Sequence, residues 1–501
     1  MMREFLLGID IGSGGCKATL LNLCSKKIIT LSQEYPTYYP KAGWAEQDCE
    51  DWIKSAGQLI KLLLDRSDCL PEQIRAVGIG GVTHSPVLLD KNRNVLGPVI
   101  HLTDARSFKQ AEWLRKKAGN IILKIGLNPV DVMWTISMLL WIRENDFDRW
   151  SRISKILFPK DYVRFRLTGS EVTDEVDAQG TLLFNPLEKS WQPDLLKLIE
   201  LNKDVLPEVA SSSDVVGKVT GEGSEWSGLK PETPVIAGTT DTLLEVYASG
   251  SVKPGDCTVK LATFGRICVI TDKPYYGKGL VNYSYIKEGL WYPGTGTRSF
   301  ATSLRWFRDE FCKDIANLKD AYSIMDDEAE GIPPGAGGLL YHPYLQGEGS
   351  PYNDPHLRGD FIGLSLHHKR GHLIRAILEG TAFSLLDCIN FIKGKGVKIN
   401  MPLKFIGGGI NSKLWTEIVA DVLGSDAVVP VATDPSIGAA LLAGVGIGVY
   451  KSIEDAQKEN SGFSKKIRHD KEKTEAYNNL FNVYKKVQNL LVDINHNLSE
   501  I

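Results

Sequence analysis

Four stretches of the sequence place glycines and polar side chains directly after apolar runs, an arrangement that suits ligand binding. In the first, GIDIGSGGCK, Asp10 precedes a turn that contains Gly12, Ser13 and Gly14. Such a turn can bring N–H groups close to an anion, and a carboxylate beside it can hold Mg²⁺, usually through water. An ordinary glycine-rich hairpin fits these residues equally well. A Walker A loop is excluded, because Gly15 is followed by neither Lys-Ser nor Lys-Thr.

The second stretch, VIAGTTDTLLE, runs from an apolar strand at 235–237 into Asp241. An aspartate at a strand end of an α/β domain points into the crevice where ligands bind. Phosphoryl transfer to an alcohol needs a carboxylate that accepts the hydroxyl proton, and Asp241 can serve as that base. The competing interpretation is a helix N-cap, a role that Thr240 or Asp241 would fill well.

The third stretch has three consecutive glycines, among them Gly408 and Gly409, after the apolar residues 403–406, and Asn411 follows. Glycines in this setting let a flat ligand lie against the main chain. Their spacing is not that of the dinucleotide fingerprint. A plain strand-to-helix connection is the alternative.

The fourth stretch, GGVTHSP, carries His84 just past an apolar run at 75–79. A histidine in a glycine-rich loop at a strand end can hydrogen-bond to a polar ligand. A structural histidine with satisfied hydrogen bonds is the other interpretation.

The elements that must position these residues follow from the spacing of apolar side chains. Short apolar or alternating runs separated by turn residues predict a mixed α/β sheet. Near the N-terminus we expect strands at 5–10, 17–23, 27–34 and 75–79, the last ending at Gly80-Gly81, and a helix at 51–65.

A strand, a turn and a second strand recur at 257–261 and 266–271, around the turn 262–265. This repeat of the arrangement around Asp10 suggests two related halves that divide near residue 246. The sequence contains no low-complexity linker, so we expect the halves to touch across a cleft. Further elements expected in the second half are helices at 372–393, 412–423 and 471–497 and a strand at 403–406.

Composition excludes several classes of protein. With 501 residues we expect two or three domains. Lys and Arg total 58 against 61 Asp and Glu, and the net charge of −3 gives no field that favours nucleic acid or a membrane. We find no signal peptide, no apolar run near the ~20 residues that span a bilayer, and no metal spacing among the eight cysteines. We therefore expect a cytoplasmic protein with reduced, mostly buried cysteines.

Taken together, these stretches resemble the FGGY family of carbohydrate kinases, and within it xylulokinases, from about residue 5 to about residue 447. The most specific segment is Gly359–Gly380, GDFIGLSLHHKRGHLIRAILEG, which fits the family's C-terminal signature throughout. Four segments before it, at 43–52, 158–169, 177–181 and 343–355, are similar to further family landmarks and stand in the family order.

The resemblance implies an α/β fold of two actin/Hsp70-like (RNase H-like) domains with a ligand cleft between them. Residues 1–246 would bind the sugar and residues 247–501 would bind ATP. The implied reaction transfers a phosphoryl group from ATP, with Mg²⁺, to a terminal hydroxyl of a small ketose, D-xylulose first among them. A homodimer is left open, because the sequence does not reveal the oligomeric state.

The resemblance also gives each site residue a role. Asp241 would be the general base and Asp10 would meet the metal. The residues that would contact the sugar are Thr83, His84, Asp104, Arg106 and Asp241. The residues that would contact the nucleotide are Gly12, Ser13, Gly14, Lys17, Thr263, Gly408, Gly409 and Asn411.

Four departures from the family pattern keep alternatives open. Met138 stands where the family has Lys, and Thr242 stands where xylulokinases usually have Asn. The second phosphate loop, usually Gly-Thr-Ser, reads Ala262-Thr263-Phe264, and residues 349–352 also differ. One alternative is a family member acting on ribulose, glycerol, gluconate or erythritol. A more distant one is a non-catalytic sugar sensor.

Overall fold

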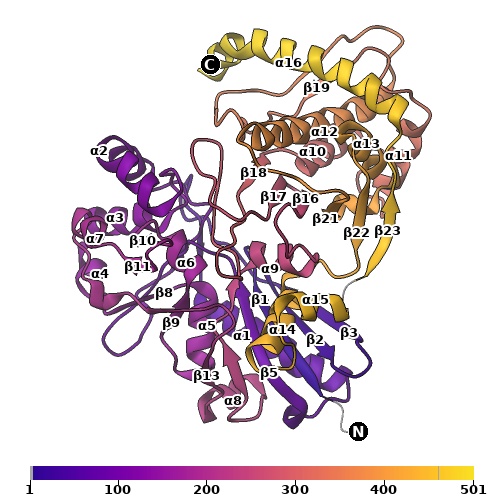
Figure 1. Ribbon diagram of the computed structural model, residues 1–501. Coiled ribbons are helices and arrows are strands. Elements are labelled where there is room, and N and C mark those ends of the chain that lie inside the picture. Colours follow the sequence, from indigo (N-terminus) through magenta and orange to yellow (C-terminus); the bar gives the residue numbers. More distant parts are fainter. Residues whose placement is uncertain (1–3, 461, 501) are drawn as a thin grey trace. The chain divides into compact units, whose positions relative to one another are not determined.

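The computed structural model describes residues 4–460 and 462–500, which fold into two compact units (Figure 1). The first unit contains the chain as far as Val252, the short segment Asn282–Trp291, and a segment that begins at Ala432 and ends before Gly462. The second unit contains Lys253–Val281, Tyr292–Val431 and the chain from Gly462 onward. The chain therefore passes between the units several times. The functional division into residues 1–246 and 247–501 stays a prediction.

The first unit is built on a seven-stranded sheet in the order β13-β14-β5-β1-β2-β3, in which β15 also pairs with β5. β1 is antiparallel to β2 and parallel to β5. The strands of this sheet are β1 (Phe5–Ile11), β2 (Gly15–Asn22), β3 (Ile28–Glu34), β5 (Ile74–Gly81), β13 (Val215–Lys218), β14 (Pro234–Ile236) and β15 (Thr239–Thr240).

Helices cover this sheet, and the remaining strands of the unit form separate pairs of short strands. The helices of the first unit are α1 (Cys49–Arg66), α2 (Phe108–Gly126), α3 (Thr135–Asn145), α4 (Phe147–Ser151), α5 (Pro159–Thr168), α6 (Glu175–Gly180), α7 (Pro193–Leu198), α8 (Gly221–Ser227), α9 (Asp241–Ala248), α14 (Pro435–Gly446) and α15 (Ile453–Asn460). The short strands are β4 (Glu46–Gln47), β6 (Val87–Leu89), β7 (Val99–Ile100), β8 (Lys155–Leu157), β9 (Val172–Asp174), β10 (Phe184–Asn185), β11 (Ser190–Trp191) and β12 (Glu208–Ala210).

Every residue of β1 is buried, because the strand is covered on both faces. Leu7 and Ile9 belong to the apolar cluster that includes Trp52 of α1. Side chains alternate along a strand, so Gly8 and Asp10 lie on the opposite face, which α14 covers. The alternation therefore places the carboxylate of Asp10 at the strand end, on the α14 side.

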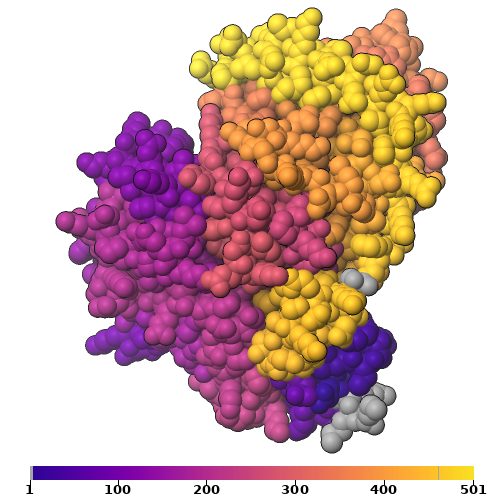
Figure 2. Space-filling view, in the orientation of Figure 1, coloured from indigo at the N-terminus to yellow at the C-terminus, as the bar shows by residue number. Residues whose placement is uncertain are grey.

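Glycines let α14 approach the sheet at backbone distance. A Cβ on Gly8 would lie 1.8 Å from the carbonyl oxygen of Ser436, and one on Gly78 would lie 2.0 Å from that of Ala439. Figure 1 shows α14 beside β1 and β5, and in Figure 2 the yellow surface of this segment adjoins the indigo surface of the N-terminal residues. A piece of chain from beyond residue 431 thus completes the first unit.

The second unit is built on a six-stranded sheet in the order β18-β17-β16-β21-β22-β23. Its strand order β18-β17-β16-β21-β22 matches β3-β2-β1-β5-β14 of the first unit, with an antiparallel hairpin followed by parallel strands in both. The predicted pair of related RNase H-like halves is confirmed. The strands are β16 (Cys257–Leu261), β17 (Gly265–Val269), β18 (Gly294–Thr297), β21 (Leu403–Ile406), β22 (Ala427–Pro430) and β23 (Phe463–Ile467), with the separate pair β19 (Leu340–His342) and β20 (Asp360–Ile362).

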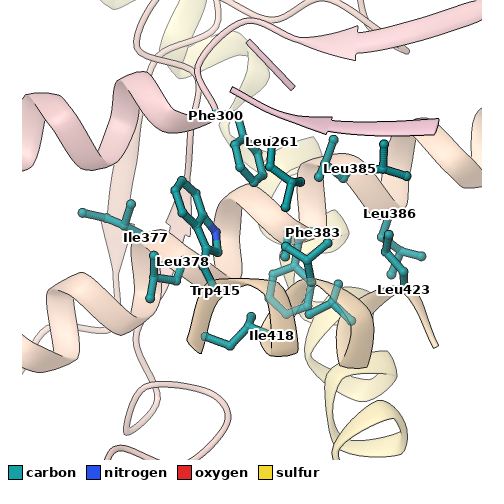
Figure 3. Close-up of a cluster of buried hydrophobic side chains, with 14 of the residues drawn as sticks. Leu261, Phe300, Ile377, Leu378, Phe383, Leu385, Leu386, Trp415, Ile418 and Leu423 are labelled. Atoms are coloured by element: carbon teal, nitrogen blue, oxygen red, sulfur yellow. The ribbon is translucent and has the colours of Figure 1, made fainter. Parts of the chain in front are cut away.

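The core of the second unit is a buried apolar cluster to which its sheet and its helices contribute. Leu261, Phe300 and Trp415 pack together there with residues of the long helix α12 (Figure 3), and the rings of Phe300 and Trp415 stack with centroids 4.5 Å apart. The helices of this unit are α10 (Ala301–Phe311), α11 (Ala321–Glu330), α12 (Arg370–Gly394), α13 (Lys413–Leu423) and α16 (Lys471–Ser499).

Most predicted elements are confirmed within one or two residues at each end. The helix expected at 51–65 is α1, capped by the Asp48 side chain, and those expected at 372–393 and 471–497 are α12 and α16. The strand expected at 75–79, with its end at Gly80-Gly81, is β5, and both glycines belong to it because they pair with β1 and β15. Seven of the eight cysteines are buried and Cys24 is exposed, as expected. Among the described residues, no helix combines the length and the apolar character of a membrane span.

Candidate active site

Two carboxylates predicted to do chemistry lie near each other in the first unit. Asp10 is the penultimate residue of β1, and Asp241 is the first residue of α9, directly after β15. β1 and β15 both pair with β5, so their ends meet at the same edge of the sheet. Thr240 occupies the N-cap position of α9 without a side-chain capping bond, and the Asp241 carboxylate instead accepts from the Thr242 amide at 2.5 Å.

The electrostatic environment of Asp10 is unfavourable for its charge. The residue is 4% exposed, and its Oδ1 atom is buried without a hydrogen-bond partner. Burial, followed by the negative charges of Asp241 and Asp434, raises the pKa of Asp10 well above the usual range, and Lys17 offsets this only in part. A buried carboxylate of this kind is well suited to a cation.

Among the described residues, no group of three His, Cys, Asp or Glu side chains is arranged to ligate a metal ion. Mg²⁺ does not require one, because it is commonly held by one or two carboxylates together with waters and substrate phosphates. The unpartnered Oδ1 of Asp10 fits such a site. A cation beside it would also relieve the repulsion from Asp241.

Lys17 faces Asp10 across the β1–β2 pair but binds another carboxylate. Its Nζ lies 2.7 Å from Oδ2 of Asp434, the N-cap of α14. Burial lowers the pKa of Lys17, but the bond to Asp434 outweighs it and the net direction is upward. The lysine predicted to meet the nucleotide is therefore paired in this structure. Sequence reasoning missed Asp434, although Asp-Pro at 434–435 is a recognisable helix-start signal.

The turn of Gly12, Ser13 and Gly14 joins β1 to β2 as predicted. The Gly12 N–H donates to the Gly15 carbonyl at 3.0 Å, and the Gln47 side chain donates to the Ser13 carbonyl at 2.8 Å. A Cβ on Gly14 would meet no atom within 4 Å, so the main chain borders open space there. Such a turn can approach an anion closely.

His84 is held on three sides and is 2% exposed. Its Nδ1 lies 3.0 Å from the Gly180 carbonyl, its Nε2 lies 2.9 Å from the Tyr283 hydroxyl, and Trp134 packs edge-to-face against the ring. A carbonyl only accepts, so Nδ1 carries the proton and Tyr283 donates to Nε2. Tyr283 carried no signal in the sequence, because it reaches His84 from a segment far along the chain.

Asp104 and Arg106 form a closed pair. Their side chains are 1% and 3% exposed. The Arg106 guanidinium binds the Asp104 carboxylate at 2.8 Å, binds Glu46 at 2.7 Å, and lies over the Trp44 ring at 3.6 Å. In the described part of the chain, their contacts link neighbouring loops and do not reach Asp241. A sugar role for this pair stays a prediction.

In the second unit, two turns predicted to bind the nucleotide lie against each other. The β16–β17 turn contains Thr263, whose carbonyl accepts from the Phe300 amide at 3.2 Å at the start of α10. The turn after β21 runs from Gly408 to Asn411, and a Cβ on Gly409 would lie 2.8 Å from that of Leu261. A Cβ on Gly408 would meet nothing within 4 Å. Glycines therefore allow this close contact and leave main chain accessible.

The departures from the family pattern have structural explanations. Met138 is buried in α3, where an apolar side chain fits the packing. Tyr352 donates to Asp387 at 2.5 Å and accepts from Lys485 at 2.5 Å, so it helps to hold α16. Phe264 is 54% exposed at the tip of its turn, where it does not disturb the core. Thr242 contacts Asp241 directly, with its hydroxyl 3.2 Å from the carboxylate.

Comparison with known proteins identifies the family. Residues 5–247 match the N-terminal domain of the FGGY family of carbohydrate kinases, and residues 267–447 match its C-terminal domain. The chain is 32% identical to a xylulose kinase of Bacillus subtilis over 98% of both chains, and 28% identical to a gluconokinase of that organism over 90% of both. The structure of a xylulose kinase from Rhodospirillum rubrum superposes with a TM-score of 0.90 and 26% identity, over 98% of this chain and 100% of the other. The strand order, the paired turns and these matches show that the chain belongs to the FGGY family of carbohydrate kinases.

Proposed function

We propose that this carbohydrate kinase phosphorylates D-xylulose with ATP and releases xylulose 5-phosphate and ADP. The observation that carries the proposal is the pair of carboxylates, Asp10 and Asp241, at one sheet edge of the first unit. The substrate class rests on the xylulose kinases to which the chain is similar over nearly its whole length.

In the proposed reaction, Asp241 accepts the proton of the terminal hydroxyl as that oxygen attacks the γ-phosphorus of ATP. The new oxygen–phosphorus bond forms as the bond from the γ-phosphorus to the β–γ bridging oxygen breaks, and ADP leaves. Thr242 is suited to orienting the base, because its amide and hydroxyl both contact the carboxylate. Asp10 would hold Mg²⁺ through water, and the ion would supply charge stabilisation at the phosphates.

The nucleotide is proposed to bind mainly to residues 247–501. The accessible main chain at Gly408 would lie against the adenosine, with Gly409 and Asn411 beside it. The N–H groups around Thr263 would face the phosphates, because the carbonyl of Thr263 is already engaged by α10. The turn 12–14 and Lys17 would contact the same phosphates from residues 1–246, which are proposed to hold the sugar.

The sugar is proposed to contact Thr83 and His84. The Thr83 hydroxyl is buried without a well-formed hydrogen bond, so a sugar hydroxyl can become its partner. Asp104 or Arg106 could contact the sugar only if the ion pair between them opened. A sugar contact of His84 would likewise require Gly180 or Tyr283 to give up a ring nitrogen. We therefore expect the strongest sugar contacts at Thr83 and Asp241.

The test is ADP release with purified protein over a panel of D-xylulose, D-ribulose, glycerol, D-gluconate and erythritol, each with ATP and Mg²⁺. We expect the highest kcat/KM with D-xylulose. Asp241→Asn is expected to lower kcat by about 10²–10⁴-fold while leaving the melting temperature unchanged, because it removes only the base. An Asp241→Asn enzyme that retains near-full kcat would remove Asp241 from the mechanism.

Two alternatives have specific support. The gluconokinase relative and the presence of Thr242 favour a substrate other than D-xylulose, such as gluconate. A higher kcat/KM with gluconate than with D-xylulose would establish this alternative. The exposed Phe264 in the phosphate turn favours a sensor that binds sugar without turnover. Sugar binding in calorimetry without ADP release on any compound would establish the sensor. A cytoplasmic location and a homodimer are proposed from sequence alone, and size-exclusion chromatography tests the latter.

A further inference from the structure

The most extensive buried charge network of the first unit lies beneath the predicted sugar-side residues and has no role in the reaction above. It consists of Lys160, Asp161 and Arg164 of α5, Asp174 at the N-cap of α6, and Asp177 within α6. All five side chains are 0% exposed. Lys160 belongs to the landmark 158–169 and Asp177 to the landmark 177–181, which the predicted site residues do not include.

Lys160 is the centre of this network. Its Nζ lies 2.6 Å from Asp161 Oδ1, 3.1 Å from Asp174 Oδ1 and 3.0 Å from Asp177 Oδ2. Burial disfavours its charge, but the three carboxylates outweigh burial and raise the pKa of Lys160. The lysine therefore stays charged in the interior and binds its own helix, α5, to the start of α6.

One branch of the network reaches the strand that leads to Asp241. The carboxylate of Asp174 accepts the hydroxyl of Thr239 at 2.7 Å, and Thr239 lies in β15, two residues before Asp241. Arg164 donates to the carbonyl of Ala237 at 2.5 Å, at the entrance to the same turn. The position of the predicted base therefore depends on the anchoring of α5 and α6.

The other branch reaches the loop that carries Thr83 and His84. α6 lies directly against this loop, because a Cβ on Gly180 would lie 2.8 Å from the Thr83 hydroxyl oxygen. At the end of α6, the Gly180 carbonyl binds Nδ1 of His84 at 3.0 Å. Lys160 also packs beneath β5, since a Cβ on Gly81 would lie 3.3 Å from that of the lysine.

We propose that Lys160 is a positioning residue of the sugar site, which holds the 82–85 loop and the 239–241 strand in fixed relation by binding α5 and α6 together. The expected change in kcat/KM rests on the proposed function, whereas the expected change in amide exchange does not. A buried ion cluster that served stability alone would not need to branch to both sugar-side segments.

The test uses the double variant Lys160→Met/Asp177→Asn, which removes one positive and one negative charge and leaves the net charge of the network unchanged. The matched control is Arg375→Met/Glu379→Gln in α12 of the second unit, a buried pair whose atoms are 2.7 Å apart. Both variants remove one buried cation and one buried anion, but the first also takes the Lys160 contact away from Asp161 and Asp174. Exchange at the two segments is therefore compared with exchange elsewhere in the same unit of the same variant, which separates a local effect from a general loss of stability. The single variant Asp177→Asn serves if the first double variant does not fold, because it keeps Lys160 and both other carboxylates.

We measure amide hydrogen exchange and steady-state kinetics. In Lys160→Met/Asp177→Asn, exchange should accelerate at both 82–85 and 239–242, kcat/KM for the sugar should fall by about 100-fold, and KM for ATP should stay constant, since a misplacement of about 1 Å has such an effect. The control should show none of these changes. Unchanged exchange at the two segments, or acceleration there to the same extent in the control, would overturn the proposal. A wild-type protein that releases no ADP would refute the proposed function alone, and the exchange data would still decide the positioning role.

Discussion

Replacing Asp10 with asparagine should make the protein more stable and less active at the same time. In the folded chain the Asp10 carboxylate is buried, its Oδ1 lacks a partner, and Asp241 and Asp434 repel its charge. An unsatisfied buried polar group costs about 1–3 kcal/mol, and more when it is charged. Asp10→Asn has nearly the same shape and removes the charge, so we expect a gain of about 1–2 kcal/mol, or about 2–8 °C in melting temperature.

The difference in stability between Asp10→Asn and wild type should depend on pH. Because the pKa of Asp10 is higher in the folded than in the unfolded chain, ionisation disfavours folding as the pH rises from the unfolded value near ~3.9 through the folded value. The advantage of Asp10→Asn should therefore be larger at pH 8 than at pH 5. Activity should fall by about 100-fold or more, because the amide is a poor partner for Mg²⁺.

Thermal unfolding of wild type and variant at both pH values, with ADP release at pH 8, tests this reasoning. Asp48→Ala is the control, because the Asp48 carboxylate caps α1 by accepting from the Glu50 amide at 2.9 Å and is not among the charges that act on Asp10. Loss of that cap should cost about 1–2 kcal/mol, the opposite sign. If Asp10→Asn melts below wild type at pH 8, or if its advantage does not change with pH, the electrostatic account of Asp10 is wrong.

Three further outcomes are expected. Gly78→Ala should destabilise the first unit by about 3 kcal/mol or more in chemical unfolding, because its Cβ would lie 2.0 Å from the Ala439 carbonyl; a normal unfolding midpoint would contradict the close packing of α14. Tyr283→Phe should raise KM for the sugar by about fivefold, through loss of a hydrogen bond to His84 worth about 1 kcal/mol, with KM for ATP unchanged. Removal of divalent cations by EDTA should abolish ADP release and added Mg²⁺ should restore it, and full activity in excess EDTA would exclude the metal role proposed for Asp10.

The local order of elements could be predicted from the sequence, because it depends on apolar spacing that neighbouring residues carry. The strand that carries Asp10 and the glycine turn after it lie where they were expected, and Thr240 takes the N-cap position that the competing interpretation of the second stretch allowed. The β18 strand was missed, because its letters GTGT carry no apolar alternation. The equivalence of the two halves was visible only as a weak repeat, and the strand order made it clear.

Long-range contacts could not be predicted, because no local pattern encodes them. Lys160 and its three carboxylate partners carried no signal of burial in the sequence, yet all four side chains are buried. Tyr283 meets His84 across 199 positions of sequence. Sequence spacing therefore located the ends of the strands, and tertiary packing decided which side chains surround them.

The docking of α14 onto β1 and β5 has a consequence for how this chain can be made. Gly8 and Gly78 are translated early, but the helix backbone that covers them is translated only after residue 431. During synthesis, the sheet face that α14 covers therefore stays uncovered until most of the chain has been translated. A fragment that ends near residue 250 should aggregate when it is expressed alone. Supplying 432–460 as a separate peptide, or fusing it to the fragment through a linker, should restore a soluble species.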